Sequence, residues 1–421
     1  MSKNIGAKPI DLRRQNYQSI IQLFRNHPTL AVRDIAQVLS LSKTAITNIL
    51  NNLTEMDIIH AVGKGESTNQ GGKKPEMYAL NSDYGYVITA YFSHEFCLCQ
   101  LYDMNYNVLG EAMESCTVQE GYPYEEVLSI LARQISSVME QNNLDERRLC
   151  GIVFQCAGII LHKEGILSRP ILSPQWGNEL HVIEDIRARL RISAPLYLNN
   201  TSRFHGCYEL LECPERRNKN IITLFCSSTV GGSQLRMGHL IHGLTGLVGE
   251  YGHLTTDYTF SERCNCGNYG CFETSVSREP VLRRICRDLK THAVSSLSRG
   301  DLSTLTIQEV FQAANDGDSL ARKHLDYVIQ QFTVLIYNMQ ITYDPDEIII
   351  QGIYANSGSY FQKSLEENIN HLSLHNIQNR MKLTFSFSYG TSSYPDQLDF
   401  AMKGAAFFCF DQYFKDLEFT V

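Results

Sequence analysis

The feature that most constrains this chain is a cluster of three cysteines within eight residues, with a histidine eleven residues before the first of them. Thiolate and imidazole groups are the ligands of tetrahedral zinc sites, and four of them complete one site. The expected ligands are His253, Cys264, Cys266 and Cys271. Gly267 and Gly270 let the chain bend tightly enough to aim the cysteines at one centre. Because protein groups fill every position, the predicted zinc is structural; the alternative is buried cysteines without a metal.

The chain has thirteen cysteines in all, which bears on the compartment in which it works. The N-terminal residues MSKNIGAKPI lead into charged residues without an apolar core, so a signal peptide is not expected. No uncharged apolar run approaches the roughly 18 residues of a membrane-spanning helix. Cysteines without an export signal indicate a reducing compartment, and we expect a cytoplasmic protein with no membrane partner.

The formal net charge of -8 is unevenly distributed along the chain. Residues 1–80 carry ten Lys and Arg against six Asp and Glu, whereas the remaining 341 residues carry 27 against 39. A small basic segment before a large acidic body indicates that only the first segment meets a polyanion. The length of 421 residues allows two or three domains. We expect a first domain at 1–80 and a second at 82–421, with the hinge near 81–85.

Residues 1–80 have the pattern of a winged helix-turn-helix. Apolar residues at i, i+3, i+4 and i+7 predict a helix that ends at His27-Pro28, a second short helix, and a third that follows Ser42 as N-cap. Two strand-forming segments, 58–62 and 76–80, flank a loop rich in glycine and lysine, as in a wing. The third helix and the loop carry groups suited to phosphates and base edges. The expected DNA contacts are Lys43, Thr44, Thr47, Asn48, Asn51, Lys64, Lys73 and Lys74. The alternative is a three-helix packing module with a solvated hairpin.

From residue 86 onward, strand-like runs alternate with helical runs. The expected strands are 86–92, 95–102, 149–154, 195–198, 221–225, 347–351 and 382–387. The expected helices are 124–141, 180–190, 202–211, 320–342 and 397–414. This alternation favours an α/β architecture with ligand chemistry at strand ends. The length of the body indicates two lobes with a small ligand between them.

The segment GEYGH at 249–253, followed by CNCGNYGCFE at 264–273, closely resembles the zinc signature of the ROK family (repressors, open reading frames, kinases). With the winged helix ahead of it, the chain resembles the repressor branch, typified by xylose and N-acetylglucosamine repressors. The resemblance covers essentially the whole chain and implies a two-lobed, actin-like sugar-kinase fold (ribonuclease H-like) behind the winged helix. It also implies that a sugar or sugar phosphate binds between the lobes. Glu250, Glu273 and His253 are then expected to face sugar hydroxyls, with His253 also a zinc ligand.

Departures from the family pattern fall where its kinases carry out phosphoryl transfer. The Asn-Asp pair whose aspartate is the general base is Asn199-Asn200 here, and an amide cannot accept the proton. In the first phosphate loop, Tyr91 and Ser93 stand roughly where the family has an aspartate and its first glycine. The second loop, residues 227–233, also carries side chains at glycine positions. Such side chains block the close backbone approach that phosphate binding needs, so we expect no kinase activity. Asn199 and Asn200 can still hydrogen-bond a sugar hydroxyl.

A second sugar-side loop, residues 168–176, ends in Gln175 and Trp176 where relatives often carry an asparagine after the proline. Trp176 is the single tryptophan of the chain. Its ring either stacks on a sugar face or seals the lobe, and the sequence leaves both open.

The sequence as a whole predicts a transcriptional regulator, expected to be a repressor, that binds operator DNA as a homodimer or homotetramer. A sugar or sugar-phosphate effector would shift a two-state equilibrium and change the spacing of paired winged helices. Two alternatives remain. One is a sugar kinase fused to a DNA-binding domain, and the other is a ligand-independent DNA-binding regulator with a decayed sugar pocket.

Overall fold

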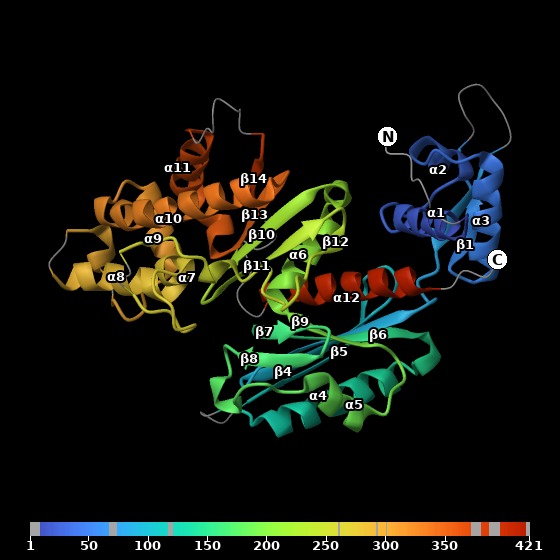
Figure 1. Ribbon diagram of the computed structural model, residues 1–421, viewed down its shortest axis with the longest axis horizontal. Helices are drawn as coiled ribbons and strands as arrows, with labels where there is room; N and C mark the ends of the chain where they lie inside the picture. Colours follow the sequence, from blue (N-terminus) through green and yellow to red (C-terminus); the bar gives the residue numbers. More distant parts are fainter. Residues whose placement is uncertain are drawn as a thin grey trace. The chain divides into compact units, whose positions relative to one another are not determined.

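The computed structural model in Figure 1 describes residues 9–66, 74–116, 121–259, 262–291, 294–299, 301–371, 380–386 and 396–417. The chain divides into two compact units. The first unit contains Met1–Cys156, Leu172–Leu198 and Ala405–Val421, and the second contains Ala157–Ile171 and Asn199–Gly404. The expected domain boundary at 81 lies inside the first unit and stays a prediction. Within the described ranges, no helix is both long and apolar enough to cross a membrane.

The N-terminal segment of the first unit has the three helices and two strands that its sequence predicts. They are α1 (Pro9–Phe24), α2 (Val32–Val38), α3 (Lys43–Glu55), β1 (Ile59–Lys64) and β2 (Glu76–Leu80). Ser42 caps α3 by accepting a hydrogen bond from the backbone N–H of Ala45 at 3.2 Å, which satisfies a donor left open at the helix start. Asn52 of α3 donates to the hydroxyl of the buried Tyr17 of α1 at 2.7 Å. β1 pairs antiparallel with β2, as the two strands of a hairpin do.

The first unit also holds a five-stranded sheet with the order β5-β4-β3-β6-β9. Its strands are β3 (Tyr86–Phe92), β4 (Phe96–Tyr102), β5 (Val108–Ser115), β6 (Leu149–Cys156) and β9 (Leu196–Asn200), the last ending in the second unit. The accompanying helices are α4 (Tyr124–Gln141), α5 (Val182–Leu190) and the 3-10 turns η1 (Glu146–Arg148) and η2 (Pro174–Trp176). β4 and β6 are buried along their whole length. Strands buried on both faces are nearly continuous apolar runs, which is why the sequence located them.

The C-terminal helix α12 (Asp396–Asp416) belongs to both units, because the division falls between Gly404 and Ala405. In the first unit, Arg25, just after α1, donates to the backbone oxygen of Phe407 at 3.2 Å and lies 3.9 Å from Asp411. The Arg25 guanidinium also lies 4.7 Å from the centre of the Phe407 ring, a cation–π contact. The N-terminal segment is therefore packed against α12.

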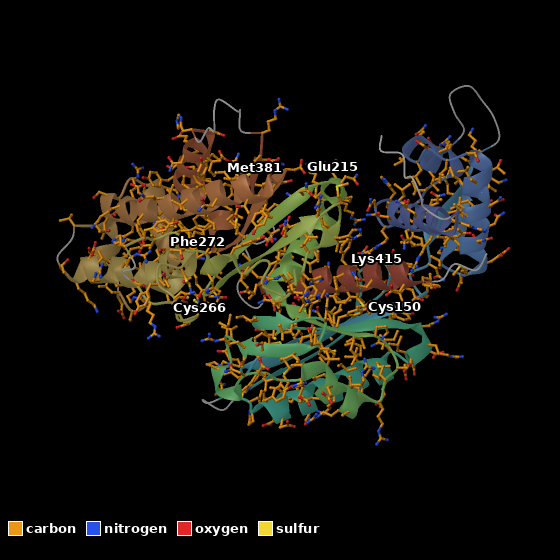
Figure 2. The ribbon with its side chains drawn as sticks, viewed as in Figure 1. Cys150, Glu215, Cys266, Phe272, Met381 and Lys415 are labelled. Atoms are coloured by element: carbon orange, nitrogen blue, oxygen red, sulfur yellow. The ribbon has the colours of Figure 1, made fainter. Side chains whose placement is uncertain are left out.

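The second unit contains a five-stranded sheet with the order β12-β11-β10-β13-β14 and a separate β7-β8 hairpin. Its strands are β7 (Gly158–Leu161), β8 (Ile166–Pro170), β10 (Asn220–Cys226), β11 (Val230–Arg236), β12 (His239–Leu240), β13 (Glu347–Gly352) and β14 (Lys382–Phe385). Its helices are α6 (Thr201–Glu212), α7 (Phe272–Val276), α8 (Arg278–Lys290), α9 (Ile307–Asn315), α10 (Ser319–Tyr343) and α11 (Gly358–His371). Its 3-10 turns are η3 (Pro214–Asn218), η4 (Tyr251–His253), η5 (Ser296–Arg299) and η6 (Ile353–Asn356). One core joins the sheet to α7–α11, with Phe272, labelled in Figure 2, packed edge-on against Phe332.

The segment 227–233 is not the single loop that the sequence analysis expects. A tight turn closes at Ser227, whose N–H donates to the oxygen of Thr229 at 2.9 Å, and β11 begins at Val230. Gly232 therefore lies in a strand, opposite Leu224 of β10. A Cβ at Gly232 would lie 2.0 Å from the backbone oxygen of Thr223, so glycine serves the packing of the sheet here.

Acidification is expected to destabilise the second unit through His205 of α6. This histidine is buried with its ring stacked 4.0 Å from that of Phe225, and burial lowers its pKa to about 3. In the unfolded chain the pKa is about 6.5, so the unfolded state alone takes up a proton between these values. The contribution of neutral His205 to the free energy of unfolding is therefore fully present above about pH 6.5. Below that pH the free energy of unfolding should fall by up to about 1.4 kcal/mol per pH unit. Burial also lowers the pKa of His162 and His324, so these histidines add to the slope. In urea unfolding between pH 7 and 5, His205→Phe should therefore have a smaller slope than the unmodified protein, while His60→Phe, at an exposed site, keeps the original slope. An unchanged slope in His205→Phe would assign the effect to another group.

Candidate functional site

The four expected metal ligands converge in the second unit. The ligand atoms of His253, Cys264, Cys266 and Cys271 all lie within 4.8 Å of one another. Nδ1 of His253 is 3.6 Å from Sγ of Cys264, and Sγ of Cys266 is 3.6 Å from Sγ of Cys271. Cys266 is labelled in Figure 2. The four side chains that the sequence analysis groups together therefore lie together, in a cluster that could hold a metal ion.

The spacing of these atoms fits a tetrahedral zinc ion. Zn–S bonds of about 2.3 Å and a Zn–N bond of about 2.0 Å at tetrahedral angles put two sulfurs about 3.8 Å apart, and a sulfur and a nitrogen about 3.5 Å apart. The two separations of 3.6 Å agree with these values. Burial raises the pKa of the Cys264 and Cys271 thiols, and a divalent cation supplies the positive charge that thiolates need there. The donor set thus suits zinc, and Nδ1 is the nitrogen of His253 that faces the cysteines.

The two glycines of the cysteine loop have the role that the sequence assigns to them. Gly267 and Gly270 have φ angles of +99° and +69°, in the left-handed region that favours glycine. A Cβ on Gly270 would also lie 2.0 Å from the backbone oxygen of Asp257. The backbone can therefore turn between Cys266 and Cys271 only with a glycine at this place.

The two carboxylates of the motif lie close to this cluster, and each already has a protein partner. Oε1 of Glu250 accepts a hydrogen bond from Arg203 at 2.6 Å, and its Oε2 lies 4.0 Å from Nε2 of His253. Glu273 accepts a hydrogen bond from the backbone N–H of Val230 at 2.8 Å. One carboxylate is thus ion-paired to a helix, and the other is tied to the start of β11.

Asn200, where the family resemblance places the kinase base, has a structural role at the start of α6. Its Oδ1 accepts hydrogen bonds from the N–H and the hydroxyl of Ser202, at 2.9 and 2.8 Å. Its Nδ2 donates to the backbone oxygen of Gly158 in β7 at 2.7 Å. An amide suits both bonds because it is donor and acceptor at once, whereas a carboxylate would face the Gly158 oxygen without a proton.

Asn199 and two histidines extend this group of polar side chains. Nδ2 of Asn199 lies 3.2 Å from Nδ1 of His242, and the His242 ring stacks on that of His162 at 4.0 Å. His162, His242 and Arg203 could not be predicted as part of this group, since no local sequence pattern marks them. The one related feature of the sequence is the glycine at position 249. In the structure its φ is +94°, and a Cβ there would lie 2.5 Å from the Arg203 guanidinium, so the glycine leaves room for Arg203.

In the first unit, side chains close the turn where the first phosphate loop is expected. Tyr91 is buried in β3, with its ring 4.9 Å from that of Phe96. The hydroxyl of Ser93 accepts a hydrogen bond from the N–H of Phe96 at 3.2 Å. The tight β3–β4 turn is therefore stabilised by a side chain that glycine lacks.

Trp176 makes the contacts that a sealing role requires. Its indole N–H donates to the backbone oxygen of Tyr122 at 2.8 Å. Its ring lies parallel to that of Phe92 and tilted against that of Tyr124, with centres 6.2 and 5.8 Å apart. These contacts fix the loop of η2 to the first unit.

The expected DNA contacts lie on one helix and one hairpin of the first unit. Those on the exposed face of α3 are Lys43, Thr44, Thr47, Asn48 and Asn51. Lys64 at the end of β1 and Lys74 before β2 are also exposed, while Lys73 lies outside the described residues. The opposite face of α3 buries Ile46, Ile49, Leu50 and Leu53, so the helix is amphipathic as expected.

Together these features define a two-unit α/β protein with a metal-ligand cluster of one histidine and three cysteines and an N-terminal segment of three helices and a hairpin. Residues 102–391 match the ROK family, and the chain belongs to this family. It is 26% identical over 381 residues to the xylose repressor of Staphylococcus xylosus, covering 90% of this chain and 88% of that protein. It is 24% identical to the N-acetylglucosamine repressor of Escherichia coli O157:H7, covering 86% of each.

Two solved structures of family members establish the fold. One is a ROK family transcriptional regulator described as a homolog of the Escherichia coli MLC protein, with a TM-score of 0.74 and 21% identity, covering 96% of this chain and 97% of that one. The other is the ROK hexokinase from Thermus thermophilus, with a TM-score of 0.59 and 16% identity, covering 77% and 97%. The body therefore has the actin-like sugar-kinase type of α/β fold that the resemblance implies.

Proposed function

We propose that this chain is a DNA-binding transcriptional repressor of the cytoplasm that responds to a sugar or sugar phosphate. The observation that carries the proposal is the row of exposed polar side chains along α3, followed by a hairpin with exposed lysines. The printed names of its relatives, xylose repressor and N-acetylglucosamine repressor, support the same conclusion.

The N-terminal segment acts as a winged helix-turn-helix in this proposal. α3 enters the major groove, where Asn48, Thr47 and Asn51 face base edges and Lys43 and Thr44 face phosphates. The β1–β2 hairpin is the wing, and Lys64, Lys73 and Lys74 contact the DNA backbone. Paired copies of the segment require a homodimer or homotetramer, because operator half-sites mirror the symmetry of the protein that binds them.

The second unit holds one structural zinc and part of the effector site. His253, Cys264, Cys266 and Cys271 bind the metal, which contributes rigidity to the loop that carries Glu250 and Glu273. These carboxylates, with Asn199, Asn200 and His253, receive the hydroxyls of the sugar. A second candidate, a ligand-independent regulator, is favoured by the internal partners that Asn200 and Glu250 already have.

A thermal-shift screen of the full-length protein distinguishes these two candidates. Sugars, sugar phosphates and amino sugars are tested at millimolar concentration, and the proposal expects at least one to raise the unfolding temperature. Any compound that does so is then added to the protein bound to an operator selected from random duplex DNA. Altered DNA affinity supports the effector role, while a screen without any shift favours the ligand-independent regulator.

No sugar-dependent phosphoryl transfer is expected from this protein, even with a sugar that binds. Asn200 offers an amide where a base is needed, and the β3–β4 turn is closed by Ser93. Asn200→Asp should not restore activity, because positioning of the nucleotide makes up most of this chemistry. Coupled ADP-release assays on both proteins check this, and sugar-dependent turnover by the unmodified chain would instead support a kinase fused to a DNA-binding domain.

A further inference from the structure

Arg203 is a buried cation next to the candidate metal centre, and it joins three separate parts of the second unit. Its side chain is 3% exposed. It lies in the first turn of α6 and donates to the hydroxyl of Ser202 at 3.0 Å and to the backbone oxygen of Gly232 in β11. Its other terminal nitrogen donates to Oε1 of Glu250 at 2.6 Å.

The backbone around Arg203 is shaped to admit its guanidinium. Gly249 has a φ of +94°, and a Cβ there would lie 2.5 Å from Nη1 of Arg203 and 2.4 Å from the oxygen of Gly232. The close approach of the loop before Glu250 to α6 therefore depends on a residue without a side chain. An incidental surface ion pair does not need such an arrangement.

The partner of Arg203 is in turn next to a candidate metal ligand. Glu250 is 9% exposed, and its second oxygen, Oε2, lies 4.0 Å from Nε2 of His253. The other nitrogen of this ring, Nδ1, faces the cysteine cluster. A carboxylate at the far nitrogen of a metal-bound imidazole fixes its tautomer and its orientation. A carboxylate this buried needs a cation or several hydrogen bonds, and Arg203 supplies the cation.

We propose that Arg203 is a positioning residue for the metal centre. It holds Glu250 so that Oε2 faces His253, and it thereby orients the imidazole toward the zinc. The inference rests on the metal centre of the proposed function. Asn200, the N-cap of α6, and Arg203 both lie at the start of this helix. Arg203 therefore also links the start of α6, where Asn200 is expected to bind the sugar, to the cysteine loop.

The test measures zinc retention by the full-length protein, purified without chelator. Arg203→Met removes the cation, Arg203→Lys keeps a charge without the planar fork, and Glu250→Gln removes the carboxylate. Arg217→Met is the matched control. Arg217 is also a 3% exposed arginine of the second unit, and it donates to the backbone oxygen of Leu210. Zinc release to a colorimetric chelator is followed below the unfolding temperature of every variant.

Arg203→Met is expected to release zinc faster than the unmodified protein, by up to about 10–100-fold, the usual cost in metal affinity when the direct partner of a metal ligand is lost. Arg203 acts through that partner, Glu250. Arg203→Lys should fall between the two, and Arg217→Met should keep the original rate. Arg203→Met combined with Glu250→Gln should be no faster than Arg203→Met alone, since both changes break the same chain of contacts. With cobalt in place of zinc, the visible d–d absorption bands of Arg203→Met should shift, whereas those of Arg217→Met should not.

Unchanged release and unchanged cobalt spectra in Arg203→Met would overturn the inference, and so would equal acceleration by Arg217→Met. Should Arg203→Met fail to fold, Arg203→Lys and Glu250→Gln decide the question by the same two measurements. Absence of stoichiometric metal from the unmodified protein would contradict the metal centre itself. A normal metal centre that is indifferent to Arg203 contradicts this inference alone.

Discussion

Cys266→Ser is expected to abolish zinc binding, with metal content falling from one zinc per chain to nearly none. A hydroxyl is a poor ligand for zinc beside two thiolates, and three remaining ligands leave the site open. Metal binding and loop folding are coupled, so the segment between His253 and Glu273 should lose protection against hydrogen exchange. Metal analysis together with hydrogen exchange of this segment measures both effects.

The control for this prediction is Cys286→Ser. Cys286 lies in α8, where its thiol contacts the backbone oxygen of Leu302 at 3.6 Å, outside the metal cluster. This variant should keep its zinc and the exchange pattern of the unmodified protein. A chelator should lower the unfolding temperature of the unmodified protein and of Cys286→Ser, but not that of Cys266→Ser. Protein purified without chelator and found free of zinc would contradict the prediction at its root.

Replacing Lys64 and Lys74 together by Ala is expected to weaken binding to all DNA sequences alike. Each phosphate contact contributes about 0.9 to the slope of log affinity against log salt, so two lost contacts flatten the slope by about 1.8. If the two proteins bind DNA equally at about 1 M salt, this difference in slope corresponds to roughly 60-fold weaker binding by the variant at about 0.1 M salt. The measurement is a fluorescence-anisotropy titration of full-length protein with duplex DNA at several salt concentrations.

Lys290→Ala combined with Lys363→Ala is the matched control, since both lysines lie on the second unit, in α8 and α11. The control changes the net charge by the same amount and should leave the salt slope unchanged. Equal salt slopes in the two double variants would contradict the proposal that the β1–β2 hairpin contacts DNA. Asn48→Ala should instead reduce the preference for operator over random DNA, because base contacts and not phosphate contacts carry sequence information.

Local pattern was enough to locate most of the fold. β3 and α4 have the bounds that the sequence predicts, since an apolar run and an amphipathic period are properties of neighbouring residues. β11 was missed because VGGSQLR has two glycines and few strand-forming residues. Its extended form comes from pairing with β10 along its whole length, and pairing is not a local property.

The sequence by itself determined which histidine and cysteines form the candidate metal-binding cluster, and it determined the amphipathic helix α3. The three cysteines lie within eight residues, and a helix face is set by spacings of three and four, so both are written in short segments. The tertiary structure alone decided how the polar residues around the metal centre are used. Arg203 meets Glu250 across 47 residues, and Asn200 meets Gly158 across 42. Such pairs form only when folding brings distant segments together and removes them from water, because buried charges and amides must then find partners.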